Sequence, residues 1–238
     1  MSDPVLEMRN LSVGYYRDLN ILQDLDIRAM PGQITTILGA NGVGKSTALK
    51  AAFGFLAPNR GDILLGGESI LDIPPHEKIL KGLAYIPQQP GVFKDMTVEE
   101  NLQLGGWTFR ADRRRVKEKI EANYERFPAL RDKRRQITGE LSGGQQRMVE
   151  IGRTLMSEPK MLLVDEPTAG LSKMLAAEVY AMLTDLARRD RLTILLVDQE
   201  IRQALKIADY VYVLELGRNK FEGPVDEFRD LEKAFWVT

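Results

Sequence analysis

The sequence contains the run Gly39-Ala40-Asn41-Gly42-Val43-Gly44-Lys45-Ser46. This run has the form G-x-x-x-x-G-K-[ST] and lies between an apolar, β-branched segment at 33–38 and a segment with helical spacing at 45–55. A glycine-rich turn between a strand and a helix lets successive backbone N–H groups point inward around an anion. Lys45 adds a mobile cation for the outer phosphates, and Ser46 is placed to ligate Mg²⁺. The run therefore predicts a phosphate-binding loop.

An acidic pair later in the chain complements this loop. Residues 161–164 are all apolar and read as a strand, which ends in Asp165 and Glu166. Asp165 can hold a magnesium shell through water, while Glu166 can orient or deprotonate an attacking water. Carboxylates at strand ends also occur for structural reasons, but a nucleotide site needs both a phosphate cradle and a metal-linked acid. The two elements together predict nucleotide hydrolysis.

Short apolar runs elsewhere predict the sheet that carries these elements. They are too short for core helices and lack alternation, and they occupy residues 82–86, 161–164, 193–197 and 210–214. Such runs are typical of strands that are covered on both faces, as in a largely parallel sheet. Near the N-terminus, residues 5–8 and 21–27 flank a polar turn at 17–20 and predict two antiparallel strands.

The pattern changes between residues 87 and 159 to helix formers and charge. Residues 98–104 and 113–127 predict helices of an inserted subdomain. Residues 110–135 hold eleven Lys and Arg against five Asp and Glu, and we favour a solvated helix face over a binding patch for this positive charge.

The composition limits the class of protein. A chain of 238 residues can form one large α/β domain with a modest insertion, and its net charge of -1 provides no field toward nucleic acid or an anionic membrane. The absence of cysteine excludes disulfides and thiolate metal sites and fits a reducing compartment. No run approaches the ~20 apolar residues of a spanning helix, and no signal-peptide pattern opens the chain, so we expect membrane association only through a partner.

One pentapeptide points to a family. Leu141-Ser142-Gly143-Gly144-Gln145 resembles the signature motif of ABC ATPases. With the phosphate loop, the Asp165–Glu166 strand end and Gln88 in Tyr85-Ile86-Pro87-Gln88, the resemblance covers nearly the whole chain. It implies an α/β fold of the P-loop NTPase class, with a mostly parallel core sheet, an antiparallel β subdomain and an inserted α-helical subdomain.

The resemblance also implies an organisation and an assembly. The chain 1–238 would be a single ABC ATP-binding domain, with residues 1–86 and 160–238 as the nucleotide-binding core and residues 87–159 as the helical signature subdomain. In this family the signature faces the γ-phosphate bound by the other subunit. We therefore expect a head-to-tail dimer with an identical or related ATP-binding subunit, transmembrane permease subunits and a solute-binding protein, on the cytoplasmic face of the membrane, with no nucleic-acid partner.

Carried over residue by residue, the resemblance assigns roles to individual side chains. Glu166 and Gln199 would be catalytic, and Ser46, Gln88 and Asp165 would contact Mg²⁺. Tyr15 would stack on adenine, with neighbouring Tyr16 as the alternative. The residues expected to bind ATP are Tyr15, Gly39, Ala40, Asn41, Gly42, Val43, Gly44, Lys45, Ser46, Thr47, Gln88, Leu141, Ser142, Gly143, Gly144, Gln145 and Asp165.

Two departures from the family pattern stand out. Gln199 occupies the position of the usual histidine, and Ser172 that of the usual aspartate. The only histidine, His76, lies far upstream and is expected to be a surface residue. With residues 151–156 and 203–209, these departures resemble the ATPase subunits of branched-chain or hydrophobic amino-acid importers. Gln88 stands where many of those carry glutamate, so urea or amide importers, lipid-type transporters and soluble ABC ATPases remain alternatives.

Overall fold

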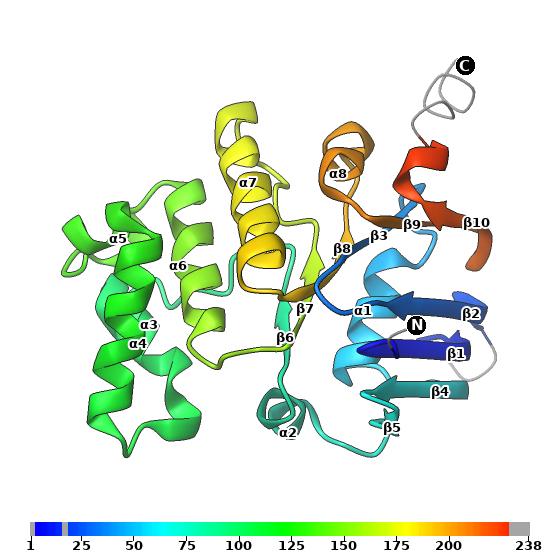
Figure 1. Cartoon of the computed structure of the whole chain (residues 1–238), viewed down its shortest axis with the longest axis horizontal. Helices are drawn as coiled ribbons and strands as arrows, with labels where there is room; N and C mark the ends of the chain where they lie inside the picture. The colour runs from blue at the N-terminus through cyan, green and yellow to red at the C-terminus, as the bar shows by residue number, and fades with distance from the viewer. Residues whose placement is uncertain (1–2, 16–18, 229–238) are drawn as a thin grey trace.

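The protein combines two β-sheets with covering helices and a separate group of helices at one end (Figure 1). The structure is a computed structural model and describes residues 3–15 and 19–228. In chain order its elements, with η for 3-10 helices, are β1 (Leu6–Val13), β2 (Leu22–Ala29), β3 (Ile34–Gly39), α1 (Lys45–Phe53), β4 (Arg60–Leu65), β5 (Glu68–Ser69), α2 (Pro75–Leu80), β6 (Leu83–Ile86), α3 (Val98–Gly105), η1 (Trp107–Phe109), α4 (Arg113–Arg126), α5 (Pro128–Asp132), η2 (Thr138–Glu140), α6 (Gly143–Leu155), β7 (Met161–Asp165), α7 (Lys173–Arg189), β8 (Thr193–Val197), α8 (Ile201–Ile207), β9 (Tyr210–Glu215), β10 (Arg218–Pro224) and η3 (Val225–Phe228).

The larger sheet carries the strands predicted from short apolar runs. Its strand order is β10-β9-β3-β8-β7-β6, and all neighbours pair in parallel except β10 with β9. Every residue of β7 and β8 is buried, as expected for strands that are covered on both faces. The prediction of a largely parallel sheet is confirmed. Because parallel strands end at the same edge, the carboxyl ends of β3, β7 and β8 lie together.

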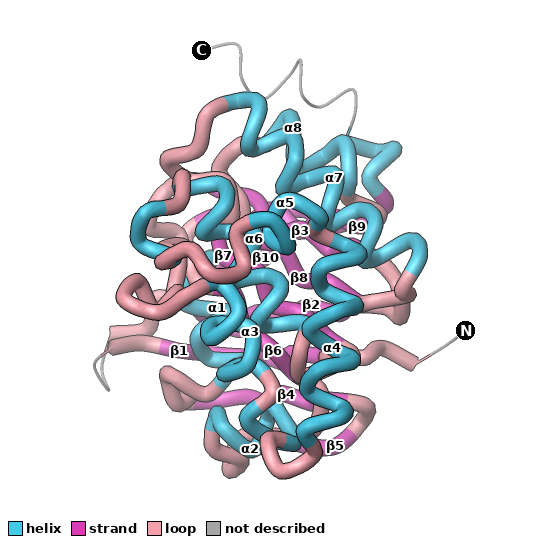
Figure 2. Tube along the Cα trace, turned by 90° about the vertical axis from the view of Figure 1, so that its left-hand side faces the viewer, coloured by secondary structure: helices cyan, strands magenta, loops and turns pink. Residues whose placement is uncertain are grey.

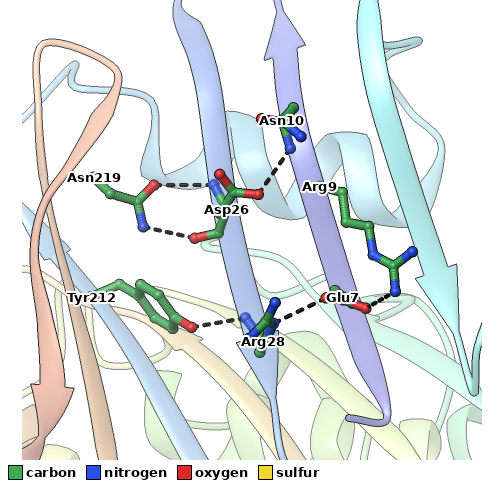
Figure 3. Close-up of polar contacts among 7 residues, drawn as sticks. All are labelled: Glu7, Arg9, Asn10, Asp26, Arg28, Tyr212 and Asn219. Carbon is green, nitrogen blue, oxygen red and sulfur yellow. Dashed lines mark hydrogen bonds and ion pairs between the residues drawn. The ribbon is translucent and has the colours of Figure 1, made fainter. Parts of the chain in front are cut away.

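The smaller sheet is antiparallel, with the order β2-β1-β4-β5, and confirms the predicted N-terminal pair. Polar contacts join it to the larger sheet (Figure 3). The Asn219 amide of β10 accepts a hydrogen bond from the Asp26 N–H at 3.1 Å and donates one to the Asp26 carbonyl at 2.7 Å. The Tyr212 hydroxyl of β9 accepts from the Arg28 N–H at 3.0 Å. These bonds fix β2 against β9 and β10.

A group of helices lies between β6 and β7 in the chain and beyond the end of the core sheet in space. Figure 2, viewed from that side, shows α3 and α4 in front of the sheets. The predicted helices at 98–104 and 113–127 are confirmed as α3 and α4. Leu102, Tyr124 and Val149 bring α3, α4 and α6 into one buried apolar cluster. A side chain at Gly105 would place a Cβ only 2.1 Å from the Arg153 carbonyl, so glycine is required where α3 meets α6.

The basic stretch in this group is paired at the surface. Arg115 and Lys119 both form ion pairs with Glu158, and the Arg126 guanidinium lies 2.5 Å from the Asp190 carboxylate. These contacts fit the favoured prediction of a solvated helix face. In the described ranges, no helix has both the length and the apolar character needed to cross a bilayer.

Two helix details differ from the sequence expectations. The helix predicted at 45–55 ends at Phe53, because Gly54 takes a left-handed conformation with φ 95°. Helix α7 was not among the predicted elements. Its buried Val179, Leu183 and Leu186 recur at helical spacing and are the signal that would have found it.

Candidate nucleotide-binding and hydrolysis site

The phosphate loop runs from the end of β3 to the start of α1. A Cβ on Gly39 would lie 2.6 Å from the Leu214 carbonyl, and Gly44 caps α1 with φ 107°, so both positions require glycine. The Lys45 ammonium donates to the Gly39 carbonyl at 2.8 Å and to the Ala40 carbonyl at 3.0 Å. The first turn of α1, Lys45 through Thr47, offers backbone N–H groups without helical partners. The loop therefore has the form of an anion cradle.

Carboxylates from two other strand ends surround Lys45. Its side chain is buried, and this burial lowers the pKa of Lys45. The carboxylates of Glu166, Asp165 and Asp198 oppose that effect and raise the pKa, in this order of strength. The ends of β3, β7 and β8 thus bring one cation and three acids to the same edge of the sheet.

The first of these acids is held by two hydroxyls. The Ser46 hydroxyl donates to Asp165 Oδ1 at 2.7 Å, and the Tyr85 hydroxyl donates to Asp165 Oδ2 at 3.0 Å. Burial, and then the nearby Asp165 charge, raise the pKa of Tyr85, so the phenol stays a proton donor. Tyr85 received no role from the sequence, although it lies in the quoted segment with Gln88.

The Ser46 and Asp165 pair fits a magnesium ion. Mg²⁺ is usually bound through one or two protein oxygens together with substrate phosphates and water, rather than in a cage of protein ligands. Within residues 3–15 and 19–228 no cluster of three or more acidic, histidine or cysteine side chains could hold a metal. A hydroxyl and a carboxylate beside a phosphate loop are the donors that such a phosphate-dependent ion requires.

Glu166 adopts an unusual backbone conformation directly after β7. Its φ is 43°, in the left-handed region that few residues other than glycine adopt, and its N–H donates to the Val197 carbonyl at 2.8 Å. Its side chain is buried beneath two amides. Both the Gln88 amide, at 2.6 Å, and the Gln199 amide, at 2.5 Å, donate to Glu166 Oε2. The structure places Gln88 against Glu166, and its contact with Mg²⁺ stays a prediction.

The backbone at Gln199 is fixed from below by Asp198. One carboxylate oxygen of Asp198 accepts from the Gln199 N–H at 2.7 Å and the Glu200 N–H at 3.0 Å, and the other accepts from the Tyr180 hydroxyl at 2.8 Å. Burial raises the pKa of Asp198, and these three hydrogen bonds oppose that shift. The arrangement directs the Gln199 side chain toward Glu166.

The predicted signature lies elsewhere in the chain's own fold. Ser142 caps α6 and forms a capping box with Gln145, while Ser142 and Gly143 are exposed. Helix α6 packs against the edge strand β6, whereas the phosphate loop follows β3, and β8 and β7 separate these two strands. In the part of the chain that the structure describes, no hydrogen bond joins the signature to the loop.

Comparison with known proteins agrees with this geometry. Residues 22–169 match a family model described as ABC transporter. The chain belongs to the ABC transporter family.

Relatives of this ABC chain span nearly its whole length. It is 39% identical to the probable branched-chain amino acid transport ATP-binding protein LivF of Archaeoglobus fulgidus, over 96% of either chain. It is 40% identical to the high-affinity branched-chain amino acid transport ATP-binding protein BraG of Pseudomonas aeruginosa, over 86% of either chain. A solved ATP-binding cassette of an ABC transporter superimposes with a TM-score of 0.88 at 29% identity, covering 98% of this chain and 96% of that one.

The remaining predicted positions of the ABC chain lie at its surface. Tyr15 is 54% exposed, and the alternative Tyr16 lies outside the described residues. Ser172, at the family's aspartate position, caps α7 by accepting from the Leu175 N–H at 3.4 Å. His76 is exposed on α2, as expected. The position of the nucleotide base therefore stays a prediction, while the phosphate and hydrolysis groups converge.

Proposed function

We propose that this chain is the ATP-binding and ATP-hydrolysing subunit of an importer for branched-chain or other hydrophobic amino acids. The observation that carries the hydrolytic part is the convergence of Lys45, the Ser46–Asp165 pair and Glu166 at one edge of the core sheet. The two relatives near 40% identity, both named for branched-chain amino acid transport, support the substrate class.

The geometry supports a definite course of hydrolysis. The ATP phosphates enter the loop at the start of α1, where Lys45 exchanges the Gly39 and Ala40 carbonyls for phosphate oxygens. Ser46 and Asp165 hold Mg²⁺, which when bound neutralises charge on the phosphates. Glu166 orients a water and takes its proton, so that the water oxygen bonds to the γ-phosphorus while the bond to the β-phosphate oxygen breaks. Gln88 and Gln199 hold one oxygen of Glu166 and thereby aim the other.

The separation of the signature from the loop supports a shared site. We assign residues 87–159 to a helical signature subdomain and residues 1–86 and 160–238 to the nucleotide-binding core. An exposed, capped helix start at Ser142 offers N–H groups to an anion, but not to the phosphate in its own chain. A second subunit, identical or related, placed head to tail would receive it. Each ATP would then be enclosed by the loop of one subunit and the signature of the other.

The transport role is tested by what the chain accompanies. We expect an affinity-tagged chain, purified from detergent-solubilised membranes, to bring down transmembrane permease subunits, which place it at the inner face of the membrane. A solute-binding protein should stimulate ATP hydrolysis by the reconstituted complex when leucine, isoleucine or valine is present. Stimulation by urea, an amide or a lipid instead would overturn the substrate class. Recovery of the active chain from the cytosol without any membrane protein would contradict the transport role.

Gln199 provides a prediction that is specific to this chain. Gln199→Ala removes a hydrogen bond to Glu166 and should lower kcat roughly 10- to 100-fold, as for one or two transition-state hydrogen bonds of ~1.4 kcal/mol each. Gln199→His should restore much of this loss and add a dependence of kcat on pH between about 6 and 7, because imidazole titrates there. The measurement is kcat against pH for the three proteins with saturating Mg·ATP. Full kcat in Gln199→Ala would show that this contact does not serve hydrolysis.

A further inference from the structure

A buried ion pair lies in α6, shortly after the signature. The side chains of Arg147 and Glu150, one helical turn apart, are both 1% exposed, and Arg147 Nη1 lies 2.6 Å from Glu150 Oε2. Most ion pairs along this chain are at the surface, where they contribute little. A fully buried arginine and glutamate on one helix therefore call for a specific explanation.

Both side chains reach from α6 to the loop that follows β6. Arg147 Nη1 donates to the Pro87 carbonyl at 2.7 Å, and Nη2 donates to the Gln88 carbonyl. Glu150 Oε1 accepts from the Gly91 N–H at 2.6 Å. The pair thus holds the backbone of residues 87–91 at three points. The Gln88 side chain, which the same loop carries, donates to Glu166.

The pair is costly for a purely structural contact. Burial lowers the pKa of Arg147 and raises that of Glu150, and each group offsets this effect in the other. Among the described residues, Arg147 Nε is buried without a hydrogen-bond partner. Apolar residues of similar volume often stabilise a core as well as a buried ion pair does. The planar guanidinium does provide what apolar groups lack, namely a rigid fork that spans two consecutive carbonyls.

We propose that Arg147 and Glu150 are positioning residues for ATP hydrolysis, which hold the 87–91 loop against α6 so that Gln88 stays bonded to Glu166. The proposal rests on the proposed function of this site. The chain of contacts runs from the signature helix through Arg147 to the Gln88 carbonyl, and from the Gln88 side chain to Glu166. The position of α6 and the aim of the catalytic carboxylate are thereby coupled through one loop.

A double-mutant cycle tests whether Arg147 acts through Gln88. Arg147→Lys keeps the charge beside Glu150 but cannot bridge both carbonyls, so kcat should fall about tenfold with the Kd for ATP within about twofold of wild type. In a Gln88→Ala background the same change should cost less than about twofold, because its target is already gone. Arg126→Lys, at the surface pair with Asp190, is the matched control and should leave kcat unchanged. An equal loss from Arg147→Lys in both backgrounds would overturn the proposal, as would an unchanged kcat in the single variant.

A second measurement does not depend on ATP turnover. Hydrogen exchange of the peptide containing residues 87–91 should be faster in Arg147→Lys than in wild type, and equally so in the double variant Arg147→Met with Glu150→Leu, whose apolar pair preserves the fold if the single variant does not. Arg126→Lys should leave this exchange as in wild type. Unchanged exchange in folded variants would overturn the proposal. If wild type does not hydrolyse ATP but exchange changes as expected, the proposed function fails while the positioning contact stands.

Discussion

Glu166→Gln is expected to lower kcat for ATP hydrolysis by roughly 10³-fold, because an amide can orient a water but cannot take its proton. The shape of the site should survive. The replacement is isosteric, and an amide oxygen can still accept the hydrogen bonds that Gln88 and Gln199 donate to Glu166 Oε2. The Kd for ATP should therefore stay within about threefold of wild type, since the phosphate contacts of the loop are untouched.

Unhydrolysed ATP should then accumulate in a closed assembly. We expect Glu166→Gln to form a dimer by size-exclusion chromatography with Mg·ATP but not with Mg·ADP. Glu118→Gln is the control, because this exposed residue of α4 is far from the site in the chain and pairs only with neighbouring Arg114 among the described ion pairs. A Glu166→Gln chain that still turns over ATP at half the wild-type rate would refute its role as the base. One that stays monomeric with ATP, while the wild-type membrane complex hydrolyses it, would count against the shared site.

Lys45→Ala is expected to reduce kcat/KM for ATP roughly 10²- to 10³-fold, because it removes the cation that the loop directs at the phosphates. The Lys45 side chain is only 4% exposed and is held between the Gly39 and Ala40 carbonyls. Neither water nor a neighbouring side chain can therefore easily replace its charge. Most of the loss should appear as weaker ATP binding, which fluorescence titration with a labelled nucleotide would measure.

Lys50→Ala provides the matched control, since Lys50 lies on the same helix α1 and is partly exposed. It should leave both the Kd and kcat unchanged. Circular dichroism and Tm would show that the Lys45 variant is folded. Turnover within a factor of two of wild type in Lys45→Ala would remove the assignment of this loop to phosphate binding.

Local chemistry made part of this protein predictable from sequence. The loop between β3 and α1 needs glycines and a lysine at neighbouring positions of one segment, so the pattern of 39–46 reveals it without knowledge of the fold. Short apolar runs likewise revealed the parallel strands, because a strand covered on both faces has no polar side. The Asp165–Glu166 strand end followed from the same pattern. For these features the physical requirement lies within a few consecutive residues.

The pairings at the site required the folded chain. Ser46 and Asp165 are 119 positions apart, and only the parallel order β3-β8-β7 brings their strand ends to one edge. Gln88 was assigned to the metal and the water from its motif, whereas the structure shows its amide on Glu166. Tyr85 carried no distinct signal, since its hydroxyl has a role only where β6 lies beside β7.

The Arg147–Glu150 pair shows the limit most clearly. In the sequence, a basic and an acidic residue three positions apart on a helix read as a surface pair. They are buried because α6 packs on the 87–91 loop, a contact between segments about 60 positions apart that no local pattern encodes. The residue types and their order along the chain thus specified the phosphate loop, the strands and the acidic strand end. Which side chains meet around Glu166, and what holds them there, depended on strand order and helix packing, because those contacts join residues that only folding brings together.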